Sequence, residues 1–344
     1  MTLVRTVVGN MDRRRFALRT AFPAIVAVVA LLIAWVTPAM ALGTWEDAAD
    51  VPSVGGGVEG MSVGVTDAYI VAAYGFDPGV GDTNTTRVYS IVSDTWTFGA
   101  DAPLPVRSEG IGILRDGRLY SIGGRSNDLG SVLSNLDRYT KNTNTWVSLA
   151  PMPTARAGLG GAVSGKYIYA IGGRTNIGGP CTGGALDTVE RYNTQTNTWD
   201  TLASLPTARS DLAALAMGNG KIYVFGGCDA SSSVVGDVDV YTIATNTWSA
   251  APPPDMPTPR AAFYQVGFVG PRIYVMGGAD IDLLVSDKNE VFNTSNNTWS
   301  VNTPMTTPRG EMGVGSIGGT IWTVGGAMPA FGTSSNAVET FKLP

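Results

Sequence analysis

The chain has 344 residues, of which 44 are glycine and 20 are proline, and only 15% of its side chains are charged. Its 23 basic and 28 acidic side chains give a net charge of −5, and no run of lysine and arginine offers the basic patch that a nucleic-acid partner requires. The chain contains no histidine, which excludes Ser-His-Asp and Cys-His catalysis and removes the commonest ligand of zinc and copper.

Residues 1–41 have the pattern of an export signal. A stretch with four arginines at 13–19 precedes the apolar run 24–36, and Ala39-Met40-Ala41 forms a cleavage motif. We predict that this signal peptide is removed, that residues 42–344 form a single domain, and that the protein is secreted or periplasmic. The arginine run resembles a twin-arginine signal, with general secretion as the alternative. If the segment is retained, the uncharged stretch 20–42 would anchor the protein in a membrane.

A unit of about fifty residues recurs along the rest of the chain. Each copy ends in an aromatic residue, six further residues and a tryptophan, at Tyr89/Trp96, Tyr139/Trp146, Tyr192/Trp199, Tyr241/Trp248 and Phe292/Trp299. A glycine pair precedes most of these motifs, at Gly123/Gly124, Gly172/Gly173, Gly226/Gly227 and Gly277/Gly278. A fixed period of this length indicates one supersecondary unit repeated along the chain, and its recurring aromatic side chains are predicted to form the core.

Each unit is predicted to contain four short strands. In the third unit these strands cover residues 156–164, 166–173, 188–193 and 198–203, where small, β-branched and aromatic residues predominate. The turn at 193–197 is rich in asparagine and threonine, and asparagine tolerates the left-handed backbone of a hairpin turn. No long amphipathic helical pattern follows the N-terminal segment, so the fold is predicted to be all-β.

These residues resemble the kelch repeat, which combines a hydrophobic run, two glycines, an aromatic residue and a tryptophan. In the fourth unit, residues 222–225 are followed by Gly226, Gly227, Tyr241 and Trp248. The resemblance covers nearly all of residues 42–344. It implies that each unit is a four-stranded blade of a β-propeller.

The number of blades follows from the two ends of the chain. A sixth unit begins at Thr307 and includes Gly325/Gly326 and Phe341, but the chain stops before a tryptophan can follow. The missing strand is predicted at the other end, where Thr44 and Trp45 repeat the dipeptide that opens the fourth strand elsewhere. We therefore predict six blades, with the ring closed by the N-terminal strand at Trp45. In the first blade, Ala73-Tyr74 replaces the glycine pair.

Charged residues recur where the first strand of each blade begins. Five blades place an arginine there: Arg107, Arg156, Arg209, Arg260 and Arg309. Three of them carry a carboxylate two residues later, at Glu109, Asp211 and Glu311, and Glu59 occupies that place in the blade without the arginine. Residues two apart in a strand face the same side, so each arginine and its acid are predicted to point toward the channel mouth. They would form a binding pocket for an anionic or sugar-like ligand. In the alternative, each arginine pairs with the neighbouring acid two residues later or caps a blade turn.

The two cysteines lie in equivalent loops of adjacent blades. Cys228 directly follows one glycine pair, and Cys181 lies eight residues after the preceding pair. We predict a disulfide between them, which an exported protein can keep. On the chain-entropy model such a bond stabilises the fold by about 4 kcal/mol.

Three classes of function remain open. The leading one is a non-enzymatic module that binds a protein or glycan with its channel mouth and with the loops after the glycine pairs, at 125–132, 174–185 and 229–235. The second is a sugar-modifying enzyme similar to the bacterial periplasmic sialic acid mutarotases, which are six-bladed kelch propellers, with arginine and carboxylate groups transferring protons. The third is a structural role in an envelope or surface layer. Galactose oxidase-like enzymes also carry kelch blades, but their copper site includes histidines. We predict no metal site and no cofactor, and the ligand and oligomeric state stay open.

Overall fold

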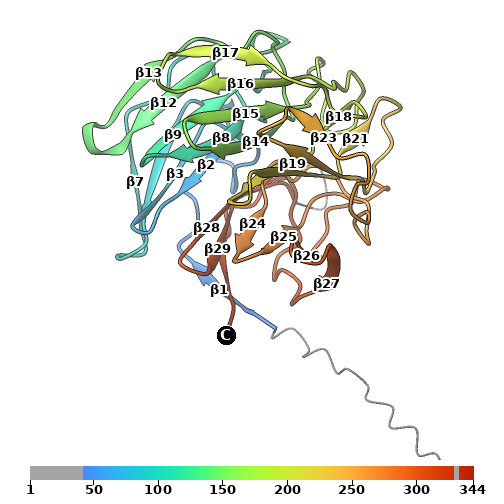
Figure 1. Cartoon of the computed structure of the whole chain (residues 1–344). Coiled ribbons are helices and arrows are strands. Elements are labelled where there is room, and N and C mark those ends of the chain that lie inside the picture. The colour runs from blue at the N-terminus through green and yellow to red at the C-terminus, as the bar shows by residue number, and fades with distance from the viewer. Residues whose placement is uncertain (1–41, 329–332) are drawn as a thin grey trace, which may run out of the picture. The chain divides into compact units, whose positions relative to one another are not determined.

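The computed structural model describes residues 42–328 and 333–344, which belong to one all-β unit. The predicted signal segment, residues 1–41, lies outside the described residues. Within the described part, six four-stranded antiparallel sheets are arranged around a central axis (Figure 1). The predicted six-bladed β-propeller is therefore confirmed.

The strands of the first three blades follow one another along the chain from the axis outward. Blade 1 consists of β2 (Ser62–Val65), β3 (Tyr69–Ala73), β6 (Thr86–Ser90) and β7 (Thr95–Phe98). Blade 2 consists of β8 (Ile111–Arg115), β9 (Arg118–Ile122), β12 (Leu136–Thr140) and β13 (Thr145–Ser148). Blade 3 consists of β14 (Gly160–Ser164), β15 (Tyr167–Ile171), β16 (Val189–Asn193) and β17 (Thr198–Thr201).

The last three blades repeat this order. Blade 4 consists of β19 (Ala213–Met217), β20 (Lys221–Phe225), β22 (Val238–Thr242) and β23 (Thr247–Trp248). Blade 5 consists of β24 (Gly267–Val269), β25 (Arg272–Met276), β26 (Asn289–Asn293) and β27 (Thr298–Val301). Blade 6 consists of β28 (Gly313–Ile317), β29 (Thr320–Val324), β30 (Val338–Lys342) and β1 (Thr44–Ala48).

Short strand pairs lie in or beside the loops. They are β4 (Phe76–Asp77) with β5 (Gly81–Asp82), β10 (Arg125–Ser126) with β11 (Ser131–Val132), and β18 (Arg209–Ser210) with β21 (Cys228–Asp229). One 3₁₀ turn, η1 (Lys141–Thr143), precedes β13. Among the described residues, no helix has the length and hydropathy needed to cross a membrane.

The ring closes as the sequence predicted. β1 pairs antiparallel with β30 and places Trp45 opposite Phe341, with ring centroids 5.0 Å apart. The indole nitrogen of Trp45 also donates to the carbonyl of Thr303 at 3.1 Å, which ties the strand to blade 5. The first strand of the unit therefore completes its last sheet, and no edge of β30 is left unpaired.

The recurring aromatic pairs hold neighbouring blades together. Tyr192 lies opposite Trp199 in the β16–β17 pair, with ring centroids 5.2 Å apart. The indole of Trp199 donates to the carbonyl of Ala150 in blade 2 at 2.8 Å. The side-chain oxygen of Asn197 accepts from the Ala150 nitrogen at 2.9 Å and from the Tyr192 hydroxyl at 2.8 Å. The motif thus supplies both a core contact and a connection to the next blade.

The first strands are rich in glycine because they crowd around the axis. A Cβ atom at Gly112 would collide with the backbone of Val63, and one at Gly313 would collide with the Val63 side chain. Blade 1 keeps the glycine-pair geometry one residue later than predicted. Tyr74 and Gly75 have φ angles of 61° and 103°, as Gly123 and Gly124 have 64° and 108°.

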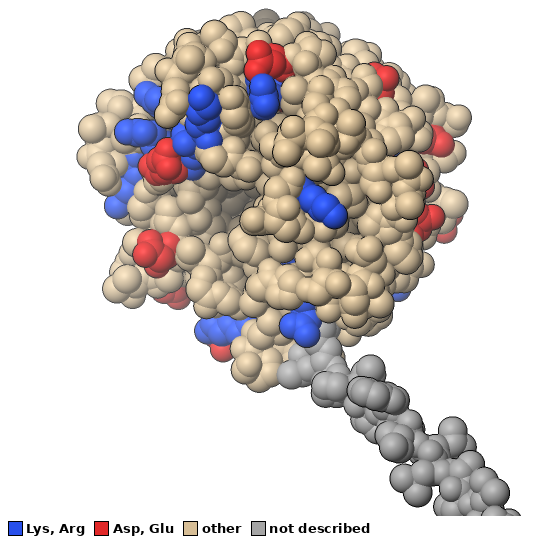
Figure 2. Space-filling model, viewed as in Figure 1, with Lys and Arg blue, Asp and Glu red and all other residues tan. Residues whose placement is uncertain are grey.

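Antiparallel strands place successive connections on opposite faces of the ring. We call the face with the loops between the second and third strands of each blade the mouth face, and the opposite one the far face. The connections between blades also lie on the mouth face. Figure 2 shows one face of the molecule, on which acidic and basic side chains are scattered over a mostly neutral surface.

Candidate binding site at the channel mouth

Six residues, one from each blade, form a closed circle of backbone hydrogen bonds around the axis. They are Gly60, Glu109, Gly158, Asp211, Ala262 and Glu311, and their φ angles lie between 50° and 61°. Each backbone nitrogen donates to the carbonyl of the preceding member, at 2.6–3.1 Å, and Gly60 donates to Glu311 to close the circle. We call this arrangement the axial circle. It fixes the places from which side chains enter the channel mouth.

The axial circle brings together three of the four predicted acids. Glu109, Asp211 and Glu311 come from blades 2, 4 and 6, and they alternate with glycine or alanine from the other three blades. The predicted place of Glu59 is wrong by one residue, because Gly60 occupies the circle in blade 1. The Glu59 side chain nevertheless lines the same pocket as Glu109 and Glu311.

The five predicted arginines do not face the channel mouth. Each is buried and forms an ion pair with an acid on the third strand of its own blade: Arg107 with Asp137 at 2.8 Å, Arg156 with Glu190 at 2.5 Å, Arg209 with Asp239, Arg260 with Glu290 at 2.8 Å, and Arg309 with Glu339 at 2.6 Å. Burial lowers the pKa of Arg260 and Arg309, and their acids oppose that effect. The expected orientation of the arginines is therefore wrong, and their partners are acids on the third strands and not the neighbouring acids two residues further on.

Two other arginines reach the channel mouth, and the sequence had indicated them only as the first residues of two predicted recognition loops. Arg125 and Arg174 directly follow the glycine pairs of blades 2 and 3. Arg174 is fully buried and forms ion pairs with both Glu109 and Asp211, while Arg125 pairs with the other oxygen of Glu109. Although burial alone would lower it, the carboxylates of Asp211 and Glu109 raise the pKa of Arg174 well above its ordinary value. The repeated Gly-Gly-Arg sequence was the signal that could have revealed these arginines.

A cavity of about 420 Å³ opens above these groups on the mouth face. We call it the mouth pocket. Its lining residues are Glu59, Phe76, Glu109, Arg125, Asn127, Gly179, Pro180, Leu283 and Glu311. Two of the predicted recognition loops contribute to this lining, 125–132 and 174–185, whereas none of the described lining residues comes from 229–235. The mouth pocket combines apolar walls with several carboxylates, as small-ligand and side-chain pockets do.

Two carboxyls in the lining of the mouth pocket form no ion pair with any described arginine, and their pKa values are raised. Burial, together with the nearby Glu109, raises the pKa of Glu59 to about 7, against a hydrogen bond from Ser334 and the charge of Arg125. Burial raises the pKa of Glu311 well above its ordinary value, and the charges of Glu109 and Glu59 add to this effect. Glu59 can therefore donate or accept a proton near neutral pH.

Tyr264 and Gln265 form the floor of the channel mouth. The amide nitrogen of Gln265 donates to the carbonyls of Val63 at 3.2 Å and Gly112 at 2.7 Å, and its oxygen accepts from the Val314 nitrogen at 3.0 Å. The Tyr264 hydroxyl lies 3.5 Å from a carboxylate oxygen of Asp211. A second, largely apolar cavity of about 300 Å³ lies within the ring of first strands, with Gln265 in its lining. The sequence signal for this floor was Gln265 itself, a long polar residue at a place where the other blades have small or apolar residues.

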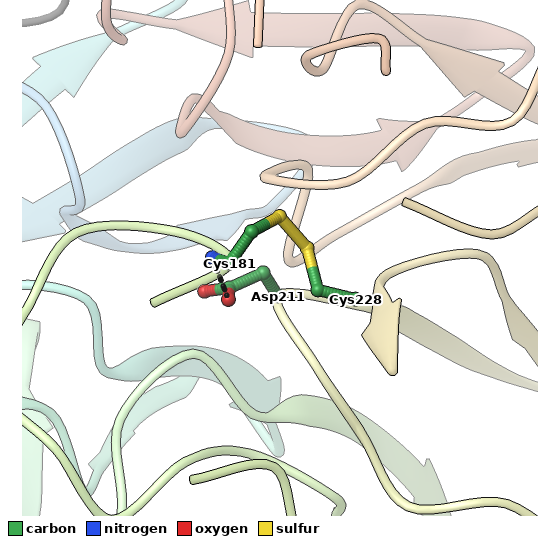
Figure 3. A group of neighbouring side chains, drawn as sticks. All are labelled: Cys181, Asp211 and Cys228. Carbon is green, nitrogen blue, oxygen red and sulfur yellow. Dashed lines mark hydrogen bonds between the residues drawn. A yellow bond between two sulfur atoms is a disulfide. The ribbon is translucent and has the colours of Figure 1, made fainter. Parts of the chain in front are cut away.

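A disulfide joins Cys181 to Cys228 across blades 3 and 4, with their Cα atoms 5.2 Å apart. The Cys181 backbone nitrogen donates to Asp211 at 3.1 Å, so the disulfide and Asp211 lie together under the 174–185 loop (Figure 3). Cys181, Cys228 and Asp211 are close enough to be considered as metal ligands. Both sulfur atoms are already bonded to each other, however, and a metal would need them as thiolates.

Comparison with known proteins finds the same repeat. The family model described as KLHDC2/KLHL20/DRC7 Kelch-repeats domain matches residues 111–332. The chain is 28% identical over 237 residues to Alpha-scruin of Limulus polyphemus, covering 65% of this chain and 25% of that protein. It is 31% identical over 178 residues to Kelch-like protein 36 of Mus musculus, covering 52% of this chain and 28% of that protein.

A fungal protein matches over a longer stretch. The chain is 27% identical over 277 residues to Kelch-like protein terF of Aspergillus terreus, covering 76% of this chain and 58% of that protein. The chain thus spans less than two thirds of the length of each of these three relatives.

Proposed function

Because the chain belongs to the kelch-repeat family, we propose that it is a non-enzymatic binding module that recognises a partner protein with its mouth face. Kelch-repeat proteins generally mediate protein interactions. The observation that carries the proposal is the mouth pocket, where Phe76, Pro180 and Leu283 surround carboxylates that are held by the axial circle. A rigid ring with varied loops on one face is a suitable frame for recognition.

The proposal includes export of the module. The pattern of residues 1–41 supports it, and the Cys181–Cys228 disulfide is compatible with an oxidising compartment. Cell fractionation tests it directly. Protein found in the periplasm or medium with residue 42 at its N-terminus supports export, and full-length protein confined to the cytoplasm contradicts it.

A glycan remains the alternative ligand for the same face. The arrangement of the arginines does not favour an anionic sugar, because Arg125 and Arg174 are already engaged by Glu109 and Asp211. A neutral sugar could instead bond to the carboxyl groups. A glycan array probed with the full chain measures sugar binding separately from protein binding.

Photo-crosslinking tests the recognition face. A photoreactive amino acid replaces Leu283, which is 36% exposed in the mouth pocket, in the full chain produced in its natural host. The matched control replaces Val92, which is 90% exposed in a turn on the far face. We expect a discrete protein adduct from position 283 and none from position 92. Adducts of equal yield from both positions, or none from either, would contradict a protein-binding mouth face.

One observation favours an enzymatic alternative. The mouth pocket holds two carboxyls in different states, since Glu109 is paired with two arginines while the pKa of Glu59 is raised to about 7. Such a pair can act as base and acid in a sugar isomerisation. Exchange between sugar anomers, followed by NMR, would show catalysis that Glu59→Gln abolishes. An exchange rate equal to that of buffer removes this alternative.

A further inference from the structure

Acidic side chains outnumber basic ones around the mouth pocket. The carboxyls of Glu59, Asp82, Glu109, Asp211 and Glu311 lie there with the guanidinium groups of Arg125 and Arg174. Both guanidinium groups are engaged by Glu109 and Asp211. Among the described residues, no arginine or lysine therefore forms an ion pair with Glu59, Asp82 or Glu311.

Glu311 is the least satisfied of these carboxyls. Its side chain is 3% exposed and lines the mouth pocket. Within residues 42–328 and 333–344, no group donates a hydrogen bond to its carboxyl oxygens or forms an ion pair with them. Glu59, 8% exposed, accepts one hydrogen bond from the Ser334 hydroxyl at 3.0 Å. A buried carboxyl without a donor destabilises a fold, and a ligand that brings donors removes this cost.

The lining of the mouth pocket indicates which kind of hydrogen-bond donor a ligand would bring. Phe76, Pro180 and Leu283 give it apolar walls, and the carboxyls of Glu59 and Glu311 also line it. Lysine and arginine side chains have this distribution, with a long apolar stem and a charged end that donates several hydrogen bonds. A volume of about 420 Å³ leaves room for such a side chain and part of the adjoining backbone.

The loops around the pocket carry charge of the same sign. The six loops between the second and third strands contain nine aspartates and three basic residues: Asp77, Asp82, Asp128, Asp187, Asp229, Asp237, Asp280, Asp282 and Asp287 against Arg125, Arg174 and Lys288. A face with this excess attracts a basic partner and repels an acidic one during encounter.

We propose that the mouth pocket binds an arginine or lysine side chain of a partner protein, with Glu311 and Glu59 accepting its hydrogen bonds. The inference rests on the proposed function, because it names the group by which a protein partner would be recognised. In this arrangement the axial circle holds Glu311 at the mouth pocket. The loops that carry Phe76, Pro180 and Leu283 enclose the apolar stem of the bound side chain.

A displayed library of random peptides tests the inference. The full chain is the target, and selected peptides are measured against three forms: the unaltered chain, Glu311→Gln and Glu46→Gln. Glu46 is the matched control, because it is an exposed glutamate on β1 that pairs with Lys342. We expect the selected peptides to share a basic residue. Replacing it by citrulline or norleucine should weaken binding at least tenfold. Glu311→Gln should weaken binding by a similar factor, and Glu46→Gln should leave it unchanged.

The outcomes separate the inference from the proposed function. Peptides that bind the mouth face without a basic residue, or whose affinity does not depend on Glu311, overturn the inference and leave the binding module intact. If no peptide or crosslinked protein engages the mouth face, both fail. Because Glu311→Gln replaces a buried carboxyl that no described group bonds to, we expect it to fold at least as stably as the unaltered chain, and a thermal unfolding curve checks this. A second variant, Leu283→Ser, should leave the carboxyls in place and weaken binding of the same peptides, because it removes part of the apolar wall without adding a charge.

Discussion

At the scale of single residues, three glutamates of the channel mouth show how surroundings decide the state of one chemical group. Glu109 lies between Arg125 and Arg174, while Glu59 has one hydroxyl donor and Glu311 has none among the described residues. Burial raises the pKa of both Glu59 and Glu311. The two therefore reduce the stability of the folded state when they are ionised, which is a common property of binding sites that await a partner.

The pKa of Glu59 leads to a prediction about stability and pH. Its pKa rises from 4.5 to about 7 on folding, so the folded state holds a proton that the unfolded state has lost. Stability is unaffected below pH 4.5, falls as the pH rises toward 7, and then stays lower by on the order of 3 kcal/mol. We expect Glu59→Gln to recover most of this free energy at pH 8 and none at pH 4. Urea unfolding at the two pH values measures it.

Glu46→Gln serves as the control for that measurement, because Glu46 is exposed and lies on β1, the outermost strand of blade 6. A gain from Glu59→Gln of the same size at pH 4 and pH 8 would show that the effect is not electrostatic. The pKa of Glu59 would then lie near its ordinary value in the folded protein.

At the scale of elements, the strands were predictable and the direction of the arginines was not. The register that places Tyr192 opposite Trp199 follows from their separation by one short turn. The rule that residues two apart face the same side holds only inside a strand. Between Arg107 and β8 lies Glu109, whose φ of 55° reverses the chain before Ile111 begins the strand. Arg107 and Glu109 therefore diverge, and no pattern in the sequence marks a left-handed glutamate.

The residues of the channel mouth could be predicted only in part. The acids could be found because they recur at one spacing in several blades. Arg174 could not be matched with Glu109 and Asp211 from spacing, since it reaches across two blade boundaries from a loop. Contacts across the axis depend on how six blades close, which is a property of the folded ring and not of any single repeat.

The disulfide between Cys181 and Cys228 should have a measurable effect on the free energy of unfolding. It joins loops of adjacent blades that are 47 residues apart in sequence, so it restricts the unfolded chain. We expect Cys181→Ser with Cys228→Ser to lower the free energy of unfolding by up to about 4 kcal/mol. Denaturant unfolding of both forms measures the difference. A thiol assay that finds two free cysteines in the unreduced protein would contradict the bond itself.

At the scale of the whole molecule, stability depends on closure of the ring by β1. Deleting residues 42–48 would expose the edge of β30 and leave Phe341 without Trp45. We expect the deletion to lower the unfolding temperature and to cause association that increases with protein concentration, because an unpaired strand edge binds other chains. Calorimetry and size-exclusion chromatography check both effects.

A synthetic peptide of residues 43–48 provides the control for the deletion. Added in excess, it should occupy the vacant edge as an extra strand and restore the unfolding temperature. A truncated protein that stays monomeric and unfolds at the original temperature would show that β1 is dispensable for closure.

The axial circle also separates the bonds that hold the frame together from the side chains that would contact a ligand. Its hydrogen bonds use backbone groups alone, and its members already include glycine, alanine, aspartate and glutamate with nearly the same φ angles. At the four members that already carry a Cβ atom, alanine, aspartate and glutamate can therefore replace one another without disturbing the bonds that hold the blades at the axis. Gly60 and Gly158 are different, because a Cβ atom there would collide with Glu109 in the first case and with Arg174 and Asp211 in the second. The chemistry of the channel mouth can thus change at four positions while its backbone frame stays constant.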